Sequence, residues 1–145
     1  MSHEIAEIGP KAAWELLKSD SGVRLVDVRT RAEWSFVGVP DLAQLDRQTV
    51  LVEWKSFPQM ARNENFVTDL QAAISDGPAT QLLFICRSGA RSLEAARAVA
   101  VAMGDAEHAP VCVNVAEGFE GDLNGAAHRG HSNGWKAAGL PWRQS

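Results

Sequence analysis

Three features are scarce in this sequence, and each scarcity excludes a class of protein. No apolar run approaches the length of about 20 residues that a membrane-spanning helix needs. Fourteen basic residues stand against 18 acidic ones, and the formal net charge of -4 argues against a nucleic-acid or acidic-membrane partner. The two cysteines, Cys86 and Cys112, are too few for a disulfide framework. His128 and His131 lie three positions apart, but a metal site needs more ligands, so we predict no metal and no cofactor.

The remaining composition is that of an ordinary globular chain. Its 145 residues are 46% hydrophobic and 22% charged, which fits one domain with a real core. We expect that core over about residues 5–122 and an irregular segment over residues 123–145. Residues 1–5 show no basic segment followed by an apolar one, so we expect no signal peptide and a cytoplasmic location. A disulfide between the two cysteines is not expected in that reducing compartment.

Short apolar runs alternate with helical patterns along the chain, which is typical of an α/β domain with a mostly parallel sheet. We expect about five strands, flanked by helices on both faces. The patterns predict strands at 23–28, 50–54, 82–85 and 111–115, and helices at 10–18, after Thr30, at 66–74 and at 92–103. Ligands of such sheets bind outside the carboxyl ends of the strands. Four of these ends bring Arg29, Trp54, Cys86 and Glu117 to that edge.

The most informative stretch runs from Leu83 to Ser92, where Cys86 ends a buried strand and precedes a helix. Backbone N–H groups of the intervening loop and the positive end of the helix dipole point toward the sulfur. Gly89 permits backbone angles that other residues resist, and Arg87 and Arg91 add positive charge. These features favour the thiolate, which is the nucleophilic form of cysteine. The competing interpretation is that Cys86 is a small, inert apolar residue at a strand end.

The segment Cys86-Arg87-Ser88-Gly89-Ala90-Arg91 resembles the active-site loop of rhodanese-like domains. Residues 25–34, LVDVRTRAEW, are similar to the early strand and turn of that family. Residues 114–119, NVAEGF, and residues 134–141, GWKAAGLP, resemble its later strand and its C-terminal segment. The segments occur in the family's order and span most of the chain. One departure is the stretch Gly38-Val39-Pro40-Asp41-Leu42, which lacks a histidine that many members carry, and this bears on donor specificity.

The resemblance implies a sulfurtransferase. Cys86 takes sulfane sulfur from a small anionic donor such as thiosulfate, or from a persulfide, and passes it to cyanide or to a thiol acceptor, a protein thiol included. The implied donor-binding loop consists of Arg87, Ser88, Gly89, Ala90 and Arg91. Asp27 and Arg29 support it, with Asp27 expected either to hold a loop N–H or an arginine, or to be a plain strand-end carboxylate. A persulfide carrier, a sulfur relay or a binding module without independent turnover is the main alternative.

The length of the loop separates this activity from two others of the same fold class, cysteine phosphatase and arsenate reductase. Four residues lie between Cys86 and Arg91, one fewer than in phosphatase loops. The shorter loop leaves room for one sulfur atom rather than for a phosphate group. No nearby aspartate or histidine is an obvious general acid, so the sequence ranks phosphatase below sulfurtransferase.

Three further expectations concern the surroundings of the loop. We expect Arg29, Arg31, Arg87 and Arg91 to cluster at the carboxyl edge of the sheet and to attract anionic donors. Cys112, in the middle of a strand, is expected to pack in the core. The apolar segment 54–60, WKSFPQM, either packs on the core or forms a wall over the Cys86 pocket, and we favour packing on the core.

Overall fold

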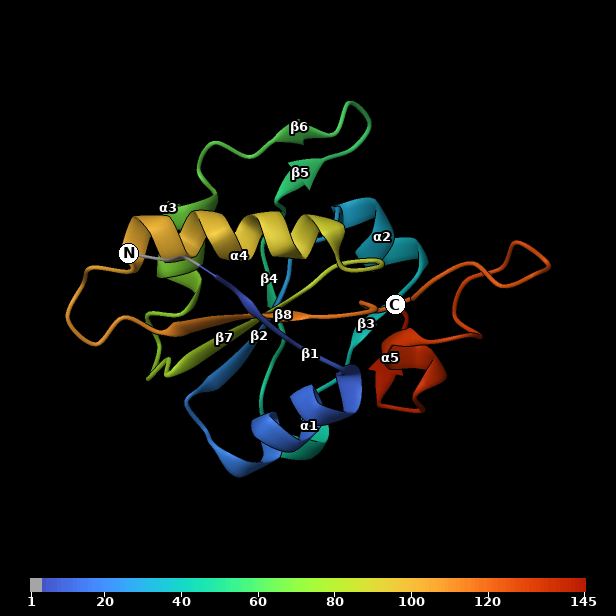
Figure 1. Cartoon of the computed structure of the whole chain (residues 1–145), viewed down its shortest axis with the longest axis horizontal. Coiled ribbons are helices and arrows are strands. Elements are labelled where there is room, and N and C mark those ends of the chain that lie inside the picture. Colours follow the sequence, from blue (N-terminus) through green and yellow to red (C-terminus); the bar gives the residue numbers. More distant parts are fainter. Residues whose placement is uncertain (1–3) are drawn as a thin grey trace.

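A parallel sheet of five strands organises the chain, as the computed structural model shows for residues 4–145 (Figure 1). The strands lie in the order β1-β8-β7-β2-β4, and every neighbouring pair is parallel. Their bounds are β1 Ala6–Ile8, β2 Val23–Asp27, β4 Val50–Leu51, β7 Gln81–Ile85 and β8 Val111–Val115. The expected fold class is therefore confirmed. The first three residues, on which part of the signal-peptide expectation rests, lie outside the described residues.

Helices cover both faces of the sheet. Their bounds are α1 Pro10–Ser19, α2 Arg31–Phe36, α3 Phe66–Ala73, α4 Ala90–Met103 and α5 Gly134–Ala137, with a 3-10 turn, η1, at Ala43–Leu45. Figure 1 shows α3 and α4 on one face and α1 and α5 on the other. Two pairs of short strands complete the structure, β3 Val39–Pro40 with β9 Trp142–Arg143, and β5 Lys55–Ser56 with β6 Ala61–Arg62. None of the helices within residues 4–145 is long and apolar enough to cross a membrane.

Alternation along the strands divides the core in two, because successive side chains point to opposite faces of the sheet. In β7, Leu82 and Phe84 pack under α3 and α4, whereas Leu83 and Ile85 pack over α1 and α5. Cys86 continues the first of these sets, which places its side chain on the α4 face. The strand and the helix that follows it therefore fix the direction of the sulfur.

Three predicted elements have different bounds in the structure. The strand expected at 50–54 is a regular strand only at Val50–Leu51, although Val52 N and Trp54 N beyond it still donate to the Asp27 and Val28 carbonyls, each at 3.1 Å. The helix expected from residue 92 begins at Ala90. The segment 123–145 was expected to be irregular, but its last part forms α5 and β9, and Trp135 of α5 is fully buried against Trp14. Trp135 therefore extends the core beyond the predicted boundary at residue 122, whereas residues 123–133 contain no helix or strand.

Candidate active site

Cys86 lies between the end of β7 and the start of α4, and its side chain is 1% exposed. The backbone N–H of Gly89 donates to Cys86 Sγ at 3.1 Å. The sulfur also lies near the first turn of α4, where unpaired N–H groups and the helix dipole favour negative charge. Gly89 has φ of 113°, a conformation that side chains other than glycine rarely adopt. The loop therefore offers the sulfur a hydrogen-bond donor and a positive electrostatic environment.

The turn after β8 is hydrogen-bonded to the backbone of this loop. Phe119 N donates to the Cys86 carbonyl at 2.8 Å, and Glu120 N and Gly121 N donate to the Arg87 carbonyl. Gly118 lies so close to Cys86 and Arg87 that a β-carbon there would overlap their backbone. Hydrogen bonds from the turn after β8 thus fix the backbone of the loop at Cys86 and Arg87, which stabilises its shape.

Arg91 is paired with Glu33 of α2 rather than left free for an anion. Its Nη1 and Nη2 donate to Glu33 Oε1 and Oε2 at 2.7 and 2.9 Å. Burial opposes ionisation of Glu33, but the hydrogen bonds from Arg91 and from the Thr30 backbone outweigh it and hold the pKa of Glu33 below its usual range. Burial likewise disfavours charge on Arg91, yet Glu33 and Cys86 raise the pKa of the guanidinium above its usual range. The pair ties α2 to the first turn of α4.

Asp27 and Arg29 form a second, fully buried ion pair. Arg29 Nη2 donates to Asp27 Oδ2 at 2.7 Å and to the Gly38 carbonyl at 2.7 Å, and both side chains are 0% exposed. The guanidinium also lies over the Phe119 ring, 4.3 Å from its centroid. Asp27 thus binds Arg29. Holding an arginine was one of the roles considered for Asp27.

A hollow of about 580 Å³ opens beside the loop. It is lined by five charged residues, Glu33, Arg87, Arg91, Glu120 and Arg129, and by Thr30, Ala32, Val37, Phe57 and Met60. Cys86 itself is not among the lining residues. Arg29 and Arg31 do not line it either. The prediction that Arg29, Arg31, Arg87 and Arg91 form one surface that attracts anions is therefore wrong. Arg29 is instead buried in its ion pair with Asp27, Arg91 is paired with Glu33, and Arg31 lines a different hollow with Trp34 and Leu51.

For the segment 54–60, one of the two interpretations is correct at Trp54 and the other at the turn that follows it. Trp54 packs in the core, 5.1 Å from Phe66 between ring centroids, and its indole N–H donates to Glu94 Oε1. Phe57 and Met60, in the turn between β5 and β6, line the hollow and are 66% and 38% exposed. Packing on the core is therefore correct for Trp54 and wrong for the turn, which forms an apolar wall at the hollow.

Two polar residues that the sequence patterns did not single out lie beside the sulfur. Ser92 Oγ is 3.2 Å from Cys86 Sγ and 2.6 Å from Asn114 Oδ1, and both Ser92 and Asn114 are 0% exposed. Asn114 stands out in the strand Val111–Val115 as a polar residue on an otherwise apolar face. That pattern was the available signal, because a buried asparagine needs partners.

Two further residues from the sequence analysis, Cys112 and Glu117, lie in surroundings that belong to the fold rather than to the Cys86 site. Cys112 is buried, and burial raises the pKa of its thiol to about 11. Glu117, expected at the carboxyl edge, accepts a hydrogen bond from Gly134 N and so holds α5. Neither contact joins these side chains to Cys86.

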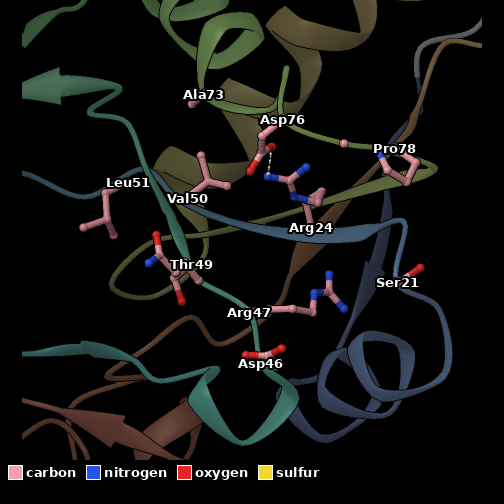
Figure 2. A pocket seen from close by; sticks show the side chains of 12 residues that line it. Ser21, Arg24, Asp46, Arg47, Thr49, Val50, Leu51, Ala73, Asp76 and Pro78 are labelled. Carbon is pink, nitrogen blue, oxygen red and sulfur yellow. Dashed lines mark hydrogen bonds and ion pairs between the residues drawn. The ribbon is translucent and has the colours of Figure 1, made fainter.

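A second hollow, of about 600 Å³, lies over the edge strand β4 and shares no lining residue with the first (Figure 2). Arg24 and Arg47 are its cationic residues. Arg24 pairs with Asp76 at 2.9 Å, drawn as a dashed line in Figure 2, and Arg47 donates to the Leu17 carbonyl at 2.7 Å. Burial and the nearby Arg24 hold the pKa of Arg47 below its usual range. Both cationic side chains of this hollow are therefore bonded to acceptors of the chain itself.

The fold and the site define an α/β protein with a buried cysteine in the loop between a central strand and the following helix. Comparison with known families identifies the family of the chain, because a rhodanese-like domain model matches residues 9–124. The chain therefore belongs to the rhodanese-like domain family. The uncharacterized protein RP600 of Rickettsia prowazekii is 34% identical over 131 residues, which cover 90% of this chain and 91% of the relative.

Solved structures agree with this assignment. The protein Rv0390 from M. tuberculosis is 44% identical, with a TM-score of 0.84 over 98% of this chain and 100% of that one. Two others have TM-scores of 0.55. A polysulfide-sulfur transferase homodimer from Wolinella succinogenes is 17% identical, over 97% of this chain and 80% of its own. A Rhodopseudomonas palustris protein, described as a candidate tyrosine phosphatase, is 21% identical over 96% and 85%. At such low identity these two share the fold alone.

Proposed function

We propose that this protein is a sulfurtransferase that carries sulfane sulfur as a persulfide on Cys86. The observation that carries the proposal is the contact set of Cys86 Sγ, which has the Gly89 N–H at 3.1 Å and the Ser92 hydroxyl at 3.2 Å. Hydrogen bonds to the charged form of a group favour that form, and the Arg91 guanidinium adds positive charge. Membership of the rhodanese-like family supports the same chemistry.

In the proposed reaction, the Cys86 thiolate attacks the sulfane sulfur of the donor. A new S–S bond forms to Sγ, the S–S bond within the donor breaks, and its electron pair leaves with the rest of the donor, which is sulfite when thiosulfate is used. An acceptor thiolate or cyanide then attacks the outer sulfur, and the electron pair of the broken bond returns to Cys86. The cycle restores the thiolate and needs neither metal nor cofactor.

The surroundings of Cys86 support transfer of one atom rather than of a large group. Its side chain is 1% exposed, and Arg87, which follows it directly, is exposed at the hollow. The buried Cys112, whose thiol pKa is raised to about 11, is a poor nucleophile at neutral pH. Cys86 is therefore the residue on which sulfur is expected to accumulate.

Intact mass after incubation with thiosulfate tests the proposal. We expect the wild type to gain one sulfur atom, to lose it on addition of cyanide, and to repeat the cycle with turnover. Cys86→Ser should gain none, whereas Cys112→Ser is the matched control and should still gain one. Loading without turnover would identify a persulfide carrier, and no loading by the folded wild type from thiosulfate or from a glutathione persulfide would reject the proposal.

A further inference from the structure

A chain of side-chain hydrogen bonds runs from the Cys86 sulfur to the edge of the sheet. Ser92 Oγ lies 3.2 Å from Cys86 Sγ and 2.6 Å from Asn114 Oδ1. Asn114 Nδ2 donates to Glu7 Oε1 at 2.9 Å and to the Gly89 carbonyl at 3.1 Å. Ser92 and Asn114 are fully buried, whereas Glu7 is exposed on the edge strand β1.

The partners of Asn114 fix the direction of this chain. Its amide nitrogen carries two hydrogens, and two oxygen acceptors face it, so both hydrogens are used. The reversed amide would place its own oxygen against those two oxygens. Asn114 Oδ1 therefore faces Ser92, and Ser92 is the donor in the 2.6 Å bond.

A serine hydroxyl has one hydrogen, so Ser92 cannot donate to Asn114 and to Cys86 at the same time. While Ser92 donates to Asn114, a lone pair of its oxygen faces Cys86 Sγ, and only the protonated thiol can donate to it. When Cys86 is a thiolate, the better arrangement turns the Ser92 hydrogen to the sulfur, because hydrogen bonds to charged groups are the stronger ones.

We propose that the Ser92 hydroxyl shifts its hydrogen between Asn114 Oδ1 and the Cys86 nucleophile, and that Asn114 is the positioning residue that competes for this hydrogen. The Gly89 carbonyl, 3.3 Å from Ser92 Oγ, is a third and more distant acceptor. On ionisation the thiol proton leaves to solvent, the Ser92 hydrogen turns from Asn114 Oδ1 to Sγ, and no bond between heavy atoms changes. Ser92 thus stabilises the thiolate, whereas Asn114 stabilises the thiol. The inference rests on the proposed function in taking Cys86 as the nucleophile.

Charged side chains from several elements surround this network. They are Glu7 of β1, Asp27 and Arg29 at the end of β2, Glu33 of α2, Arg87 of the loop and Arg91 of α4. Asp27 with Arg29 and Glu33 with Arg91 form ion pairs. Substitutions at Ser92 and Asn114 change no formal charge, so a shift that they cause in the ionisation of Cys86 reports on hydrogen bonding.

The rate of Cys86 alkylation by iodoacetamide, followed against pH on the full chain and assigned by peptide mapping, tests the proposal. Ser92→Ala should raise the midpoint of the pH–rate profile by about one pH unit, and Ser92→Thr should restore it. Asn114→Leu, similar in size but without the amide, should lower the midpoint by about half a unit. Ser75→Ala is the control, because the hydroxyl of this exposed serine donates to the Ala72 carbonyl of its own helix end.

Opposite shifts in Ser92→Ala and Asn114→Leu support the proposal, because a general loosening of the loop would move both in one direction. Shifts of the same sign, or an unchanged midpoint in Ser92→Ala, would overturn it. Asn114→Val, a good strand former, replaces Asn114→Leu if the latter shows no cooperative melting. The assay contains no sulfur donor. A wild type that follows these shifts but never gains sulfur from thiosulfate would therefore reject the proposed function and leave this inference standing.

Discussion

Among single residues, Arg91 shows how an ion-pair partner limits the contacts that a charged side chain can make. Its two Nη atoms are bonded to both carboxylate oxygens of Glu33, and the side chains are 16% and 19% exposed. A bidentate pair of this kind is geometrically specific and stronger than a neutral hydrogen bond. Arg91 therefore acts on Cys86 as a fixed positive charge held in place by α2, rather than as a side chain free to follow a donor.

The Glu33–Arg91 pair predicts a dependence of stability on pH. The pKa of Glu33 is lower in the folded chain than its ordinary value of 4.5, so the ionised carboxylate stabilises the fold. This contribution is complete above about pH 4.5 and is lost as the pH falls through the lower folded value. Urea denaturation should show that Glu33→Gln is less stable than the wild type at neutral pH and that the difference shrinks as the pH falls below about 4.5.

A control distinguishes this pair from general acid destabilisation. Glu64→Gln changes an exposed glutamate, and its difference in unfolding free energy from the wild type should stay small at every pH. A Glu33→Gln difference that is constant across the acidic range would show that the carboxylate charge does not carry the contribution.

At the scale of elements, the turn between β5 and β6 brings an apolar surface to the hollow beside the loop. Phe57 and Met60 line this hollow together with three arginines and two glutamates. An apolar wall within a polar rim is suited to a peptide segment in which apolar side chains flank a thiol. The turn is therefore expected to contribute to the choice of acceptor and not to the chemistry at Cys86.

Phe57→Ser should slow sulfur transfer to a synthetic peptide with leucines on both sides of its cysteine by on the order of tenfold, because about 1.5–3 kcal/mol is available from burying such a side chain. Transfer to cyanide should change little. Steady-state kinetics with both acceptors measures the difference. Phe36→Ser is the matched control, since Phe36 is 82% exposed but does not line the hollow. Equal losses with both acceptors would assign Phe57 a structural role.

The elements that the sequence predicts well are those whose pattern is local. The buried strands β2, β7 and β8 and the helices α1, α3 and α4 follow apolar spacing, and the Thr30 capping box of α2 is present in full. The edge strand β1, Ala6–Ile8, carries no such signal because it is short and largely exposed. Cys86 and its loop could be found from a local motif, whereas the contacts of Ser92, Asn114 and Glu33 depend on side chains distant in sequence.

At the scale of the whole molecule, the C-terminal tail closes the α1 face of the core. Trp135 is fully buried, lies 6.0 Å from Trp14 between ring centroids, and donates its indole N–H to the Pro141 carbonyl at 2.7 Å. β9 then pairs with β3, next to the Gly38 carbonyl that accepts from Arg29. The tail thus supports the Asp27–Arg29 pair from the far end of the sequence.

Trp135→Ala should lower the free energy of unfolding by about 3–5 kcal/mol, the cost of emptying a buried aromatic site. Trp142→Ala is the matched control and should cost less, because Trp142 is 37% exposed. Urea denaturation of both variants measures the difference. A tail that merely lies on the surface would give similar, small losses for the two tryptophans.

The choice between sulfur transfer and phosphate hydrolysis depends on how the whole site is assembled. Aryl phosphates and thiosulfate are both anions that a loop of N–H groups and positive charge attracts. Phosphate chemistry also needs donors around three oxygens and an arginine free to span two of them. Only four residues separate Cys86 from Arg91, and both Nη atoms of Arg91 are bonded to Glu33. We therefore predict that the site has neither the room nor a free arginine for a phosphate group.

We therefore expect no Cys86-dependent hydrolysis of aryl phosphates by the wild type, measured by release of the phenol. Glu33→Gln removes the ion pair with Arg91 but leaves the loop length unchanged, so this variant should not hydrolyse aryl phosphates either. Insertion of one residue between Gly89 and Arg91 should reduce sulfur transfer, because it shifts the first turn of α4 and with it the Ser92 hydroxyl that faces Cys86 Sγ. Phosphatase turnover by the unmodified chain that disappears in Cys86→Ser would overturn the argument from loop length and with it the preference for sulfur transfer.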